Sequence, residues 1–331
     1  MTRRLSNSPS IILGILREAA LRKAEVSGEN ICRGLGVSRV AVWKHIQTLR
    51  RHGYKIEAHT RRGYRLHLAP DCPSELEMTP RLQGRRLGLP FRYAAEADST
   101  NRLLTAWAEE GAPEGAMIAA DTQNGGRGRR GRKWFSPPGC NLYVSVLLRP
   151  AVPPPQVPSL ALAAGLAVIR ALRRVTPTLD PKLKWPNDLY LDGRKLGGIL
   201  CDMRAESDHV HHVIVGIGLN VNLKKSVLPA ELRETATSLR LAGRLKINRP
   251  ALLVAILEEL EGVYQPWCQS GLTHFLDELR ACSWLQDKPV VAVLPHETLE
   301  GVVTGIAASG ALLLKTASGP REIHAGDIRL V

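Results

Sequence analysis

The sequence GGRGRRGRKW, residues 125–134, decides how this chain is interpreted. Four glycines are interspersed with five cations, and the run ends on Trp134. Glycine lets the backbone approach a ligand closely and adopt positive φ. Guanidinium groups and exposed backbone N–H groups both bind phosphate and carboxylate oxygens. The run therefore predicts a loop that wraps a small anion.

The residues on either side of this run favour a folded site. Arginine–glycine runs also occur in disordered segments that bind RNA, and composition alone leaves this alternative open. Here, however, strand-like residues precede the run at 116–120 and follow it at 141–148. Because loops inside folded domains often serve a site, we expect an anion-binding loop between two strands.

Length and composition limit the number of domains and the class of protein. The 331 residues leave room for two or three domains, and a hydrophobic content of 44% is typical of globular proteins. No apolar run reaches the ~18 residues of a transmembrane helix, and residues 11–16 are too short for a signal-peptide core. The six cysteines show no zinc spacing and no disulfide framework. We expect a cytoplasmic protein with no membrane partner, and the sequence assigns no metal-ligating side chains.

The net charge of +14 is concentrated near the N-terminus. Residues 1–70 contain 14 Lys and Arg against 4 Asp and Glu, a balance of +10. The remaining residues contain 31 against 27, a balance of +4. This asymmetry favours an N-terminal domain that meets nucleic acid, with a merely solvated basic surface as the alternative.

Periodicity and turn residues predict three helices in this basic segment. The first runs from residue 10 to about 24, and the second begins near Ser27. Gly36 fits the end of the second helix, and Ser38 is a good N-cap for the third. The apolar stripe of the third helix is predicted to consist of Val42, Trp43, Ile46 and Leu49.

A basic hairpin follows these helices. Residues 54–58 and 64–66 alternate as two short strands around a basic tip. Together the elements predict a winged helix-turn-helix over residues 1–69 that binds DNA, with a protein-docking winged helix as the alternative. Gln47 and Arg39 would reach base edges, and the wing arginines would hold phosphates. The candidate DNA-binding residues are Ser38, Arg39, Lys44, Gln47, Thr48, Arg51, Arg61 and Arg62.

The middle of the chain, residues 70–285, alternates strands and helices and contains the candidate chemistry. Four stretches could converge on one site. The first is Asp-Ser-Thr-Asn at 98–101, and the second is Gln123 with the run at 125–134. The third is 184–190 together with 194–200, and the fourth is the apolar strand 213–221, which contains Gly216, Gly218 and Asn220 near its end. Glycines in a strand often mark a close backbone approach. Three simpler interpretations stay open: the 98–101 residues could cap a helix, Asn187-Asp188 could be a turn, and Trp134 could be a core residue.

Taken together and in this order, these motifs resemble those of bifunctional biotin–protein ligases that also repress the biotin operon. The resemblance covers nearly the whole chain and implies an α+β multidomain fold. A winged helix-turn-helix would precede a central α/β domain of the class II synthetase type with a mixed sheet. Residues 286–331, with short strands expected at 290–294, 301–306, 311–315 and 322–324, would form a small SH3-like β-barrel.

The resemblance also implies an activity. Such enzymes join biotin to ATP as biotinyl-5′-AMP, with Mg²⁺, and then transfer biotin to a lysine of the biotin carboxyl carrier protein of acetyl-CoA carboxylase. Lys195, Arg129 and Asp188 would be the catalytic residues, with Asp188 taking a proton from the acceptor lysine or orienting it. The biotin-binding residues would be Ser99, Thr100, Asn101, Gln123, Gly126, Arg127, Gly128, Arg129, Lys195, Gly197 and Gly198. The residues that bind ATP and the adenylate would be Arg127, Arg129, Arg132, Trp134, Lys195 and Asn220.

The resemblance also implies a regulatory role, and three other interpretations of the function stay open. The adenylate-bound form would be a homodimer that binds operator DNA and represses biotin biosynthesis genes. A lipoyl or other acyl ligase on the same fold is one competing interpretation. A biotin-sensing transcription factor without ligase activity is a second, and an RNA-binding protein that uses its arginine–glycine run is a third.

Overall fold

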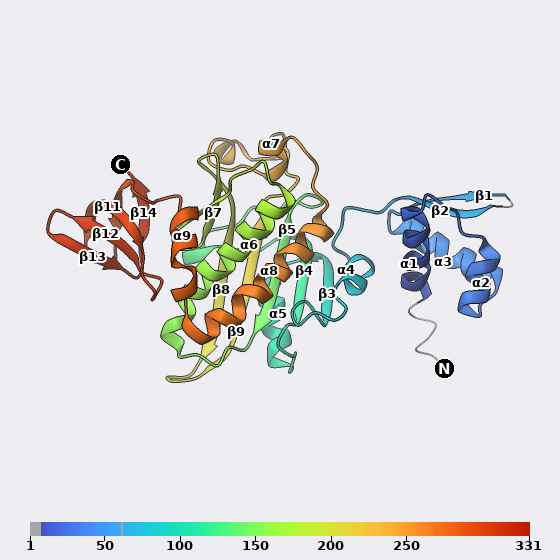
Figure 1. Ribbon diagram of the computed structural model, residues 1–331, viewed down its shortest axis with the longest axis horizontal. Helices are drawn as coiled ribbons and strands as arrows, with labels where there is room; N and C mark the ends of the chain where they lie inside the picture. Colours follow the sequence, from blue (N-terminus) through green and yellow to red (C-terminus); the bar gives the residue numbers. More distant parts are fainter. Residues whose placement is uncertain (1–7, 61) are drawn as a thin grey trace. The chain divides into compact units, whose positions relative to one another are not determined.

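The computed structural model describes residues 8–60 and 62–331 (Figure 1). The chain forms two compact units, Met1–Cys72 and Pro73–Val331. Residues 73–331 stay together as one unit, so the expected boundaries at 69/70 and 285/286 remain predictions.

The N-terminal unit is a winged helix-turn-helix, as predicted. Its elements are α1 (Ser8–Leu21), α2 (Gly28–Leu35), α3 (Arg39–Arg51), β1 (Lys55–His59) and β2 (Gly63–Leu68). The Ser38 hydroxyl accepts a hydrogen bond from Ala41 N at 3.2 Å, and Gly36 ends α2 with φ 65°. The first helix ends earlier than predicted, because Lys23 adopts the left-handed φ of 54° just after it.

The core of this unit includes Val42, Ile46 and Leu49 of α3. The assignment of Trp43 to the same stripe is wrong, because 54% of its surface is exposed. One residue along an α-helix is a rotation of about 100°. This rotation turns Trp43 away from the line formed by Val42, Ile46 and Leu49 and onto the outer face of α3.

The larger unit is built on a seven-stranded mixed sheet with the order β3-β4-β5-β9-β8-β7-β6. Strands β3 and β4 are parallel and the other neighbours are antiparallel. The strands are β3 (Phe91–Ala97), β4 (Met117–Gln123), β5 (Leu142–Leu148), β6 (Lys182–Lys184), β7 (Asp188–Leu191), β8 (Arg194–Ala205) and β9 (Val210–Leu219).

Helices cover both faces of this sheet, which is why its central strands are almost continuously apolar. Helices α6 (Leu160–Val175) and α8 (Arg249–Ser270) pack together across one face (Figure 1). There Val144 and Val146 of β5 join the main core. Helix α5 (Thr100–Glu109) packs on β4, β5 and β9 through a separate cluster that contains Leu104 and Leu147.

Short elements connect this framework. The helices are α4 (Glu75–Arg81), α7 (Leu239–Gly243) and α9 (Leu276–Cys282), and the 3₁₀ turns are η1 (Arg129–Gly131), η2 (Pro154–Ser159), η3 (Ala230–Leu232) and η4 (Thr273–Phe275). Residues Pro154–Val175 are long and apolar enough to cross a membrane, yet 78% of their most apolar window is buried inside the protein. This burial is typical of a core helix.

The chain ends in a five-stranded antiparallel sheet with the order β13-β12-β11-β10-β14. Its strands are β10 (Pro289–Val293), β11 (Thr298–Ile306), β12 (Leu312–Thr316), β13 (Gly319–Ile323) and β14 (Asp327–Leu330). The strand expected at 322–324 matches only the end of β13, and β14 was not predicted. Val290, Val303 and Leu312 join the main core of the larger unit, which packs this small sheet against the rest of that unit.

Candidate ligand-binding site

A cavity of about 490 Å³ lies where the predicted motifs converge. The start of α5, the end of β4, the beginning of β8 and the end of β9 contribute to its walls, and the arginine loop 127–135 contributes a further wall. The predicted site residues that line it are Ser99, Thr100, Asn101, Gln123, Arg127, Gly128, Arg129, Arg132, Trp134, Asp188, Lys195, Gly198 and Asn220.

Two predicted biotin-binding glycines do not line this cavity. A Cβ at Gly126 would lie 2.9 Å from both Ser136 Oγ and Trp134 O. At Gly197 it would lie 2.7 Å from Gly218 O. Both positions therefore need glycine because another chain segment packs against them, which is a structural reason independent of ligand contact.

The buried end of the cavity is a chain of polar side chains around α5. The backbone N–H of Thr100 donates to Gln123 Oε1 at 2.9 Å. Ser145 Oγ lies 2.7 Å from Thr100 Oγ1 and 2.6 Å from Asn101 Oδ1. Asn101 Nδ2 in turn donates to Asp202 at 2.6 Å. Ser99 begins the helix without a side-chain capping bond. The capping alternative thus fails for the side chain of Ser99, which is buried and lines the cavity.

Glycines on β9 make room for two of these side chains. A Cβ at Gly216 would lie 2.2 Å from Asn101 Oδ1, and one at Gly218 would lie 2.8 Å from the indole of Trp134. Trp134 therefore packs against the bare backbone of β9 at the cavity. Its Nε1 is buried and has no hydrogen-bond partner among the described residues.

The arginine loop is folded as a tight hairpin. Trp134 N donates to Gly126 O at 2.9 Å, and Gly128 N donates to Arg132 O at 2.7 Å. At its tip, Arg130 has a positive φ of 56°. This hairpin holds the guanidinium groups of the loop in a small region rather than leaving them in an extended run.

The last strand of the chain contacts this loop. Asp327 Oδ2 of β14 accepts from Arg130 Nη1 at 2.8 Å and from Arg132 Nη2 at 2.9 Å. Arg129 lies outside this cluster of Arg130, Arg132 and Asp327. Burial and the nearby charge of Arg130 lower the pKa of the Arg129 guanidinium. Its side chain lines the cavity as a half-buried cation.

Lys195 and Asp188 form the central ion pair of the cavity. Lys195 Nζ lies 2.7 Å from Asp188 Oδ1 and 5.5 Å from the centroid of the Trp134 ring. Asp188 pairs with Gly198 in the β7–β8 ladder, where a Cβ would lie 3.3 Å from the carboxylate. Glycine therefore leaves the carboxylate free to turn toward Lys195. The turn between β6 and β7 spans 185–187, so the turn interpretation holds for Asn187, and Asp188 is the first residue of β7 after it. The catalytic role of Asp188 stays a prediction.

Other lining residues were missed or differ from expectation. The side chain of Asn220 donates to Thr237 O and accepts from Asn141, so both ends of its amide bind protein groups. Lys184 begins the stretch 184–190 but was not predicted as a site residue. It lines the cavity, and burial lowers the pKa of its ammonium group. Further lining residues from segments without a recognisable motif are Leu228, Leu232, Thr235, Ala236, Asp327, Ile328 and Arg329.

The candidate DNA-binding face lies on α3 of the N-terminal unit. Val40, Trp43, Lys44, Gln47 and Arg51 follow helical spacing, and all except Gln47 are exposed. Exposed apolar Val40 and Trp43 on this face were not predicted.

The remaining predicted DNA contacts have other local partners. Ser38 Oγ caps α3. Arg39 and Arg62 lie 3.7 Å and 3.4 Å from Glu29 and Glu25. Thr48 donates to Lys44 O. These side chains would exchange such contacts for phosphates, and Arg61 lies outside the described residues.

Comparisons with known proteins agree with this geometry. Residues 93–220 match the biotin/lipoate A/B protein ligase family, residues 12–65 match an HTH domain, and residues 287–331 match the biotin protein ligase C-terminal domain. The chain is 38% identical over 305 residues to the bifunctional ligase/repressor BirA of Bacillus subtilis, covering 92% of this chain and 94% of that protein. The chain belongs to the bifunctional biotin ligase/repressor family.

Other members of this family extend the match. Identity to the Escherichia coli bifunctional ligase/repressor BirA is 33% over 304 residues, covering 92% of each chain. A solved biotin protein ligase from Aquifex aeolicus, in complex with biotin and ATP, superposes with a TM-score of 0.64 at 30% identity. That match covers 73% of this chain and 98% of the other. The solved complex thus supports a biotin and ATP site within the ligase part of the fold.

Proposed function

We propose that this protein is a cytoplasmic, ATP-dependent biotin–carrier ligase that also represses transcription. The observation that supports it best is the cavity itself. It combines a neutral hydrogen-bonding end at Ser99, Thr100 and Gln123 with a cationic end at Arg129 and Lys195. Biotin has the same polarity, because its ureido ring is neutral and its tail ends in a carboxylate.

In the first step, a biotin carboxylate oxygen attacks the α-phosphorus of ATP. The new P–O bond forms as the bond to pyrophosphate breaks, giving biotinyl-5′-AMP. Both reactants are anions, so catalysis depends largely on cations and positioning. Lys195, Arg127 and Arg129 would offset the repulsion, and the Trp134 indole, which lines the cavity, would pack beside the adenine or the biotin tail.

In the second step, the amine of the carrier lysine attacks the biotinyl carbonyl, and AMP leaves. A free lysine amine is mostly protonated at neutral pH, with a pKa near ~10.4. Asp188 lies at the cavity wall, 2.7 Å from Lys195, where a carboxylate would orient the amine and accept its proton. The amide product and AMP then leave the site.

Magnesium fits this cavity only as an ion carried mainly by the nucleotide. Two carboxylates line the cavity, those of Asp188 and Asp327, and both already pair with cations. Magnesium typically uses one or two protein carboxylates together with substrate phosphates. When bound, it would neutralise part of the triphosphate charge and be held mainly by phosphate oxygens and water.

The N-terminal unit supplies the regulatory half of the proposal. Its basic helix α3 and hairpin suit operator DNA. We infer that the adenylate-bound form is a homodimer whose two-fold symmetry matches a two-fold operator. Sedimentation tests this: the protein should dimerise at micromolar concentration with the adenylate bound, and a monomer there would contradict the switch.

The competing lipoyl ligase shares the family model that matches residues 93–220. The full-length relatives and the superposed ligase favour biotin. Mass spectrometry of the carrier protein after incubation with ATP and either acid separates the two. Modification with biotin alone is expected, and modification with lipoate alone would overturn the substrate assignment. Biotin binding without modification or adenylate formation would place the protein among biotin sensors.

A further inference from the structure

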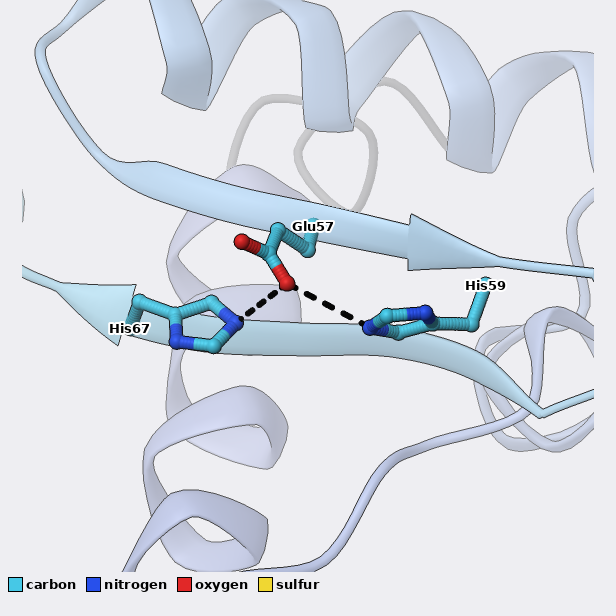
Figure 2. Close-up of side chains that lie close together, drawn as sticks. All are labelled: Glu57, His59 and His67. Atoms are coloured by element: carbon cyan, nitrogen blue, oxygen red, sulfur yellow. Dashed lines mark ion pairs between the residues drawn. The ribbon is translucent and has the colours of Figure 1, made fainter.

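Three potential metal ligands converge on the hairpin of the N-terminal unit (Figure 2). Glu57 and His59 are two residues apart on β1, and His67 lies on β2. Glu57 Oε2 lies 2.8 Å from His67 Nε2 and 3.4 Å from His59 Nε2. All three ligand atoms lie within 4.8 Å of one another. None of these residues has a role in the ligase or DNA-binding assignments above.

The strand pattern explains why these side chains gather. Side chains two residues apart on a strand share a face, and Ile56, between Lys55 and Glu57, is buried in the core. Glu57 and His59 therefore project from the opposite face of β1. Glu57 pairs with Arg65 in the ladder, so His67, two residues further along β2, projects from that same face.

The spacing suits a tetrahedral ion. Metal–nitrogen and metal–oxygen bonds of about 2.0–2.2 Å in a zinc site place neighbouring donors roughly 3.3–3.5 Å apart. Glu57 lies 2.8 Å and 3.4 Å from the two imidazoles, and the His59 and His67 nitrogens lie within 4.8 Å of each other, so side-chain rotations bring the three donors to that spacing. Glu57 and His67 are exposed, so such rotations meet little packing resistance.

A fourth donor is close by. Glu25 Oε1 lies 3.7 Å from His59 Nε2, and the side chain of Glu25 is only 14% exposed. Its other oxygen lies 3.4 Å from Arg62. Glu25 precedes Val26, which exchanges two backbone hydrogen bonds with Tyr64 of β2 and so fixes this segment beside the hairpin.

We infer that the hairpin binds one divalent first-row cation of the zinc class through Glu57, His59 and His67, with Glu25 or water as the fourth ligand. Imidazole nitrogens with a carboxylate suit such ions, whereas Mg²⁺ and Ca²⁺ prefer oxygen donors. The bound ion changes the charge of the three ligands from −1 to +1. The outer face of the hairpin then becomes more favourable to a polyanion.

Titration of the full-length protein with Zn²⁺, and with Co²⁺ as a spectroscopic probe, tests this site. The matched control is His211→Gln, which removes an exposed histidine paired with Glu206 at 3.0 Å outside the hairpin. Wild type and this control should bind one ion that is absent from His67→Gln and Glu57→Gln, or bound at least ~10-fold more weakly. Because both removed side chains are exposed, circular dichroism should show unchanged folding.

Two results would overturn the site. One is equal binding by wild type and His67→Gln. The other is a cobalt spectrum dominated by thiolate charge transfer, which would assign the ion to one of the free cysteines. The absence of binding by wild type at ~100 μM metal would have the same meaning, because structural zinc sites bind far more tightly than this.

Discussion

Replacing Asp188 by asparagine should separate the two chemical steps. The substitution keeps the size of the side chain and removes the charge that lies 2.7 Å from Lys195 Nζ. The two side chains are 26% and 35% exposed, so solvent screens their interaction. We therefore assign the pair about 1 kcal/mol, which is a loss of roughly five-fold in adenylation through a less well positioned Lys195.

The transfer step should suffer more. A positioned general base typically contributes ~10²–10⁴-fold, and Asp188 is the carboxylate at the cavity wall beside Lys195. We expect transfer to slow by at least ~100-fold while adenylation falls about five-fold. Pyrophosphate–ATP exchange measures the first step, and single-turnover transfer from preformed adenylate to the carrier protein measures the second.

A matched control is Asp180→Asn, which removes an exposed carboxylate paired with Lys182 at 2.9 Å away from the cavity. Both steps should proceed at the wild-type rate in this variant. Slower adenylation with unchanged transfer in Asp188→Asn would refute the assigned role and leave Asp188 as a positioning residue for Lys195 alone.

Three further perturbations test other parts of the site. Arg129→Gly should leave a folded enzyme that releases its adenylate, because the loop loses the half-buried cation that covers it; a retention time equal to wild type, measured by rapid filtration, would contradict this. Gly218→Ala should weaken biotin binding ~10-fold or more in calorimetry, since the new Cβ would lie 2.8 Å from the Trp134 indole; unchanged affinity would show that Trp134 moves freely. Trp43→Ala should weaken operator binding without lowering the melting temperature, because this side chain is 54% exposed on α3; equal affinity would remove Trp43 from the DNA face.

Local chemistry explains what the sequence could predict. Ser38 and Gly36 mark helix ends through capping and left-handed geometry that any backbone imposes, so the helix-turn-helix was predictable. Gly216 and Gly218 similarly predicted that other groups approach β9 closely. In the structure these groups are the side chains of Asn101 and Trp134.

Long-range packing explains what it could not predict. The position of Trp43 depends on a rotation of one residue about the helix, which a mixed apolar pattern does not define. Asp327 lies almost 200 residues beyond Arg130, its partner in the arginine loop, and no local signal joins the two. Residues 228–236 reach the cavity because Lys195 exchanges backbone hydrogen bonds with Thr235 and Thr237, which also leaves no periodic trace.

The most direct test of the central claim is biotin-dependent pyrophosphate–ATP exchange by wild type and by Lys195→Ala. The account predicts exchange that requires biotin and magnesium and falls by ~10²–10³-fold in the variant, the usual loss when one preorganised electrostatic group is removed. Biotin binding without exchange in wild type would contradict it, and the N-terminal winged helix would then be the main output of a biotin sensor.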